Sequence, residues 1–139
     1  MAPEEIRSGS NRFPPREKLK SRKSIQVLFD QGKSFSIPPL RIIFLIHPTE
    51  EAKNQGVRFA ISVPKKIAPL ATRRNRIKRL IREAYRLGKT PLIEACRSKG
   101  ILLEMMWIFN GNPEKTDFGL LRPVAAKAIN KLISFFSRN

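Results

Sequence analysis

The chain has 139 residues, 41% of them apolar, and 28 Lys and Arg against 11 Asp and Glu give it a formal net charge of +17 at pH 7. A chain of this length buries enough surface to fold as one domain without a metal or a disulfide, and its single cysteine excludes an internal disulfide. Because no apolar run could cross a bilayer and no secretion signal is visible, we expect a cytoplasmic protein whose partner is a polyanion, above all a nucleic acid.

The first third of the chain predicts a tail, a helix and a strand. Residues 1–15 lack periodicity and are expected to form a flexible basic tail, so that the folded domain spans 16–139. Apolar residues share one face over 16–31, which predicts a helix that ends before Gly32. After a Pro-Pro break, the β-branched run at 40–46 predicts a buried strand.

A second strand and a basic helix are predicted in the middle of the chain. Residues 57–63 alternate as a half-buried strand does, and we expect them to pair with 40–46 as a hairpin. Between residues 73 and 86, seven Arg or Lys stand against one Glu. Apolar residues in this region recur at helical spacing: Ile77, Leu80, Ile81, Ala84 and Leu87. A helix with one buried face and so many guanidinium groups indicates a phosphate-bearing partner, and Lys65 and Lys66 upstream could add contacts.

The last third predicts a short helical turn at 90–99, a strand at 101–109 and a helix that is capped by Thr116 or Asp117 and runs to about residue 136. Helices and strands in this order indicate an α+β domain in which helices cover one sheet. The strand, helix and strand between residues 57 and 109 would normally be joined by a right-handed crossover.

Catalytic groups are scarce in this sequence. His47 is the one histidine and is expected at the surface end of a strand, while Cys96 is expected to be a small buried residue. The acidic residues show no spacing typical of a metal-dependent nuclease, and no Gly-rich phosphate loop occurs. The protein alone is therefore not expected to catalyse a reaction. Strands, rather than a second helix, flank the basic helix, which disfavours a DNA-binding regulator.

Aromatic side chains leave two interpretations open. Phe29, Phe44 and Phe59 could stack unpaired bases if they are exposed, or they could belong to the core. Trp107 and Phe136 are predicted to be core residues.

On these residues the chain resembles the bacterial ribonuclease P protein component family. The run Arg74-Asn75-Arg76-Ile77-Lys78-Arg79 is similar to the family's signature, and the Lys65-Lys66 pair stands at the expected distance upstream. The predicted first helix, with Phe29 and the following Gly32, is similar to the family's first helix, although Ile25 stands where an aromatic residue is usual. The resemblance covers roughly residues 13–136.

The resemblance implies a fold and a function. The fold is a single-domain α+β sandwich of a small, mostly antiparallel sheet with three helices, in the order α-β-β-β-α-β-α, with a left-handed βαβ crossover through the basic helix. The implied function is that of the protein subunit of ribonuclease P, whose RNA subunit removes the 5′ leader of precursor tRNA with Mg²⁺. The implied partners are that RNA and precursor tRNA, not DNA or a membrane, in a one-to-one ribonucleoprotein.

The resemblance assigns no catalytic residue to the protein and leaves metal-contacting residues open. It implies RNA-binding roles for Lys65, Lys66, Arg73, Arg74, Asn75, Arg76, Lys78, Arg79, Arg82 and Arg86. Ile25, Phe29 and Phe44 are expected to line a cleft for the leader. The alternative is a ribosomal or other structural RNA-binding protein, which would share the charge and the helix.

Overall fold

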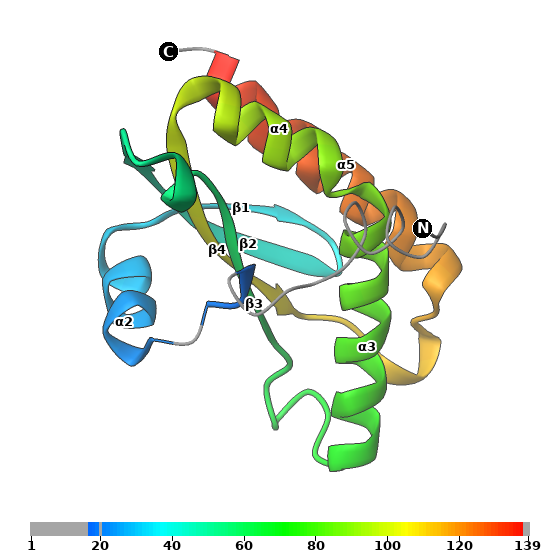
Figure 1. Cartoon of the computed structure of the whole chain (residues 1–139). Helices are drawn as coiled ribbons and strands as arrows, with labels where there is room; N and C mark the ends of the chain where they lie inside the picture. Colours follow the sequence, from blue (N-terminus) through cyan, green and yellow to red (C-terminus); the bar gives the residue numbers. More distant parts are fainter. Residues whose placement is uncertain (1–16, 20, 138–139) are drawn as a thin grey trace, which may run out of the picture.

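The computed structural model describes residues 17–19 and 21–137, so the tail expected over 1–15 lies outside the described residues. One mixed four-stranded sheet carries helices on both faces (Figure 1). The main elements are α2 (Arg22–Gln31), β1 (Lys33–Ile37), β2 (Leu40–Pro48), β3 (Gly56–Ser62), α3 (Ala71–Gly88), α4 (Thr90–Lys99), β4 (Ile101–Phe109) and α5 (Phe118–Ser137). The predicted α+β class is confirmed, with four helices in the described chain because residues 90–99 form a complete helix instead of a turn.

Helix α2 is shorter than the sequence predicts. It begins at Arg22, where the Ser21 hydroxyl accepts a hydrogen bond from the Ser24 N–H. It ends before Gly32 as predicted, and glycine is required at this position because a Cβ would lie 2.4 Å from the Leu28 carbonyl oxygen. Leu19 precedes the helix, and its N–H donates to the Phe59 carbonyl oxygen of β3 at 3.0 Å. This hydrogen bond joins the segment before α2 to the edge strand of the sheet.

The strand order is β1-β2-β4-β3. The prediction that 40–46 and 57–63 form a hairpin is wrong, because β4 lies between them, antiparallel to β2 and parallel to β3. The hairpin is instead β1 with β2, and it turns at the cis Pro38-Pro39 bond. The two longest apolar strands, β2 and β4, take the central positions, where both faces are covered.

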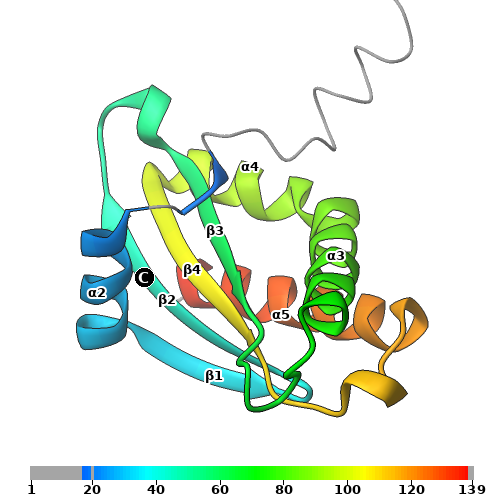
Figure 2. The same cartoon turned by 90° about the horizontal axis from the view of Figure 1, so that it is seen from below.

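The connection from β3 to β4 through α3 and α4 is left-handed, as the family resemblance implies. In Figure 1, β3 lies in front of β4, and the chain runs down β3, up α3 on the right and down β4 behind it. Figure 2 shows the same strand order from below. This crossover places α3 beside the edge strand β3, with its outer surface open to solvent.

The sheet has a different core on each face. Figure 2 shows α2 on one face and α3, α4 and α5 on the other. The larger core lies under the three helices and contains Trp107, Phe59 and Tyr85, with the Phe59 and Tyr85 ring centroids 4.2 Å apart. The smaller core lies under α2 and is formed by Leu19, Leu28, Ile43 and Met106. Trp107 and Phe136 are core residues as predicted, and Phe59 is core as well.

Cys96 lies fully buried on α4, as expected. Burial raises the pKa of its thiol to about 12, because the anionic form would lose its hydration. The thiol is therefore protonated at neutral pH and unsuited to act as a nucleophile.

Candidate nucleic-acid interface

Helix α3 is held on the sheet by a narrow apolar face. Ile77, Ile81, Ala84 and Tyr85 are buried, while the predicted stripe residues Leu80 and Leu87 are only partly covered. The buried set follows the i, i+4, i+7, i+8 spacing of an amphipathic helix. The remaining surface of the helix carries the basic residues of the signature.

Two signature arginines bind loops of the protein itself. Arg74 donates from Nη1 to the carbonyl oxygens of Ala68 and Pro69, at 3.0 and 2.8 Å. Arg76 donates to the carbonyl oxygens of Pro113 and Thr116, at 3.2 and 3.0 Å. These bonds fix the loop before α3 and the loop after β4 against the start of the helix.

Two further arginines form ion pairs. Arg73 pairs with Glu114, and Arg86 pairs with Glu83 on the same helix. The hydrogen bond from Arg86 lowers the pKa of Glu83 from its usual value, because it stabilises the ionised carboxylate. Four of the predicted RNA-binding residues therefore already have partners inside the protein, a fact that spacing along the sequence did not indicate.

The other predicted residues point outward without such partners. We name the basic face as Lys65, Lys66, Asn75, Lys78, Arg79 and Arg82. Within the described part of the chain, none of these six side chains makes a hydrogen bond or ion pair with another residue. Lys78 and Arg82 are four residues apart, as are Asn75 and Arg79, so their side chains are neighbours along one flank of α3. Asn75, Lys78, Arg79 and Arg82 thus share one flank of α3, and with Lys65 and Lys66 they supply five cationic groups and an amide that suit a polyphosphate chain.

The predicted cleft residues are only partly brought together. Phe29 is 49% exposed on α2, whereas Ile25 packs against the smaller core under this helix. Phe44 does not line the α2 side of the sheet, and its assignment to the cleft is wrong. It is 1% exposed and packs on the opposite side, with its ring centroid 5.0 Å from that of Phe135 on α5.

The wrong assignment of Phe44 to the cleft is explained by the alternation of side chains along a strand. Successive side chains of β2 point to opposite faces, so Ile43 and Leu45 face α2 while Phe44 faces α5. Because the run from residue 42 to 46 is apolar throughout, the sequence did not indicate which of its two faces would meet α2.

Sequence reasoning missed a charged network on the α2 side of the sheet. Glu104 of β4 is only 5% exposed, and its carboxylate accepts a hydrogen bond from His47, with Oε1 and Nε2 2.8 Å apart. Arg58 of the neighbouring strand β3 lies next to the second oxygen of this carboxylate, with its Nη1 3.8 Å from Oε2 of Glu104. His47 is thus partly exposed at the end of its strand, as expected, but it also has a carboxylate partner.

A family model described as Ribonuclease P matches residues 13–105, which include the whole basic face. The chain belongs to the ribonuclease P protein family. The ribonuclease P protein component of Porphyromonas gingivalis is 31% identical over 116 residues, covering 84% of this chain and 82% of the relative. That of Chlorobaculum tepidum is 40% identical over 87 residues, covering 62% of this chain and 56% of the relative. The solved ribonuclease P protein of Thermotoga maritima shares the fold, with a TM-score of 0.63 at 24% identity over 83% of this chain and 96% of that one.

Two further observations concern the kind of site that this ribonuclease P protein offers. Its described residues gather no three His, Cys, Asp or Glu side chains that could hold a metal ion. Among the same residues, no helix combines the length and the apolar character that a membrane span requires.

Proposed function

We propose that this ribonuclease P protein binds the RNA subunit of the enzyme through the basic face of α3. The observation that carries the proposal is the division of the signature: Arg74 and Arg76 bind the protein's own loops, while Lys78, Arg79 and Arg82 extend from the same helix without internal partners. Because the first group fixes the helix and its flanking loops, the backbone that carries the second group is already ordered and loses little conformational freedom on binding.

The proposal places the chemistry in RNA. The described residues do not fit a protein-held Mg²⁺ site, so any Mg²⁺ that acts in the cleavage is assigned to the RNA subunit. The protein's part is to bind RNA and to orient precursor tRNA, whose 5′ leader the holoenzyme removes. We also propose that one copy of the protein binds each RNA subunit. The proposed location is the cytoplasm, and DNA and membranes are not proposed as partners.

The α2 side of the sheet is proposed to bind the single-stranded leader. Phe29 presents an exposed ring there, and the Arg58 side chain is 40% exposed on the neighbouring strand β3. An aromatic ring and a cation suit a base and a phosphate of one RNA strand, respectively. Ile43 and Met106 form the apolar floor under α2, in place of the ring of Phe44.

The function is tested by reconstitution at low-millimolar Mg²⁺ with labelled precursor tRNA. We expect cleavage at the mature 5′ end when the protein and a bacterial ribonuclease P RNA are combined, and none with the protein alone. If the RNA is active at high Mg²⁺ but the protein never stimulates it at low Mg²⁺, a structural RNA-binding role is favoured instead. Cleavage by the protein alone would contradict the absence of a catalytic role.

Replacing Phe29 with alanine is expected to weaken binding of precursor tRNA to the reconstituted enzyme and to leave mature tRNA binding unchanged. A base stacked on an aromatic ring contributes roughly 1–3 kcal/mol, and only the precursor carries the leader. Binding of both tRNAs is measured by titration. Leu120→Ala on α5 is the matched control, because Leu120 is also a large apolar residue, 43% exposed, but lies on a different face. Equal losses for the two tRNAs would show that Phe29 does not contact the leader.

A further inference from the structure

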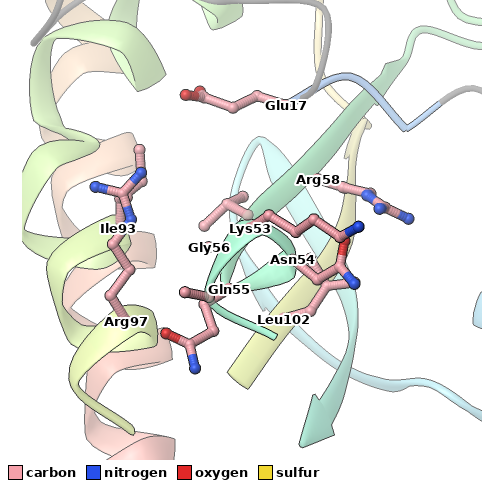
Figure 3. A pocket seen from close by; sticks show the side chains of 11 residues that line it. Glu17, Lys53, Asn54, Gln55, Gly56, Arg58, Ile93, Arg97 and Leu102 are labelled. Carbon is pink, nitrogen blue, oxygen red and sulfur yellow. The ribbon is translucent and has the colours of Figure 1, made fainter. Parts of the chain in front are cut away.

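A cavity lies at the outer edge of the sheet, away from the basic face of α3. It has a volume of about 230 Å³ and is bounded by the start of β3, the 3-10 turn η2 (Ala52–Asn54) and α4. Figure 3 shows Arg97 along the α4 wall, while Lys53 and Arg58 extend on the opposite side. Val57, Ile93 and Leu102 supply apolar lining.

The electrostatics of the cavity favour an anion. The Arg97 side chain is exposed, and its guanidinium makes no hydrogen bond or ion pair with another residue in the described chain. Glu17 lines the upper end, but its carboxylate is bound by the ammonium of Lys89 at 2.8 Å. Lys53 lies 3.5 Å from Glu51, and both side chains of this pair are largely exposed, which makes the pair weak. The positive charge of Arg97 is therefore the least compensated in the cavity.

One residue that lines the cavity also lies on the α2 side of the sheet. Arg58 lines it and also lies beside Glu104 on that side. Side chains of β3 alternate, so Arg58 and Ala60 face the same way, and Ala60 packs against the core under α2. A strand of RNA that follows this side of the sheet would therefore reach the cavity past Arg58.

We infer that this cavity binds a nucleotide of single-stranded RNA, in the part of the 5′ leader that extends beyond α2. Arg97 and Lys53 bind the phosphate backbone from two walls, and the apolar lining accommodates the base or sugar. The inference rests on the proposed function, because it requires that the leader cross the α2 side of the sheet. It adds a second contact for the leader, separate from Phe29 and from the basic face.

The test compares Arg97→Ala with Lys99→Ala in the reconstituted holoenzyme. Both changes remove one exposed positive charge from the last turn of α4, but Lys99 does not line the cavity. Affinity is measured for two precursor tRNAs, one with a leader too short to pass α2 and one extended by about ten nucleotides. We expect Arg97→Ala to lower affinity for the long-leader precursor about tenfold. For this precursor, the slope of log affinity against log salt concentration should also fall by about 0.7. Neither quantity should change for the short-leader precursor. Arg97→Lys should retain the slope, and Lys99→Ala should leave both precursors unchanged.

Other outcomes separate the inference from the proposed function. Equal effects of Arg97→Ala and Lys99→Ala would overturn the inference, as would a loss that does not depend on leader length. Failure of the wild-type protein to stimulate its RNA subunit would overturn the proposed function. In that event, the cavity is tested with the full-length free protein and a short single-stranded oligoribonucleotide. Weaker binding by Arg97→Ala than by Lys99→Ala would support the cavity as an RNA site, and equal binding would overturn it.

Discussion

Replacing Arg79 and Arg82 together with alanine is expected to weaken binding to ribonuclease P RNA by roughly a hundredfold. A hydrogen bond to a charged group contributes about 1.5 kcal/mol or more, and the two guanidinium groups have no other partner in the described chain. Both side chains are exposed on α3, so their removal is not expected to unfold the protein. The loss would therefore report contacts with RNA.

Salt dependence distinguishes these contacts from a general effect of charge. Each phosphate contact contributes about 0.7 to 0.9 to the slope of log affinity against log salt concentration, so the double variant should lower the slope by roughly 1.4 to 1.8. The control is Arg122→Ala with Lys127→Ala, which removes two exposed charges from α5 instead. If the two double variants lower the slope equally, α3 is not the specific RNA-binding element.

Replacing Glu17 with glutamine is expected to destabilise the folded protein by about 3 kcal/mol, because the Lys89 ammonium would lose the carboxylate that faces it. The side chains of Lys89 and Glu17 are only 2% and 13% exposed, so the charge left behind has little access to water. Lys89 stands between α3 and α4, and Glu17 belongs to the segment that precedes α2. The pair thus connects the layer of α3, α4 and α5 to the chain that leads into α2.

Urea unfolding, followed by circular dichroism, measures this loss. Glu114→Gln is the control, because Glu114 forms an ion pair with Arg73 in which both side chains are at least half exposed, and its loss should cost less than about 1 kcal/mol. Adding Lys89→Met to Glu17→Gln should recover much of the stability, since no buried charge then remains. A loss no larger than that of Glu114→Gln would show that the Glu17–Lys89 pair behaves like a surface pair.

The basic helix is an element that local residue patterns in the sequence could predict. Residues 71–88 form α3, which contains the whole basic stretch from 73 to 86 that was predicted to be helical. The strand at 101–109 was also recognisable from its residues. Such elements can be predicted because helical and strand periodicity depend on neighbouring residues. The strand β1 was not recognised from its own residues, which are mostly polar and lie at an edge of the sheet.

The roles within the arginine cluster could not be predicted in this way. Arg76 binds the carbonyl oxygen of Thr116, which is 40 residues further along the chain, and Arg73 pairs with Glu114 across 41 residues. The sequence pattern alone does not distinguish the roles of these arginines from those of Arg79 and Arg82. Their partners arise only when the loop after β4 folds back against the start of α3.

The sequence by itself determined that this is a basic α+β protein with an arginine-rich amphipathic helix, and the order of its residues indicated the ribonuclease P family. Only the tertiary structure decided that β4 lies between β2 and β3, that Phe44 faces α5, and that Glu17 pairs with Lys89 across 72 residues. The physical reason is that periodicity is a local property of the chain. Strand order, the buried face of an apolar strand and the partners of a charge depend on contacts between distant segments.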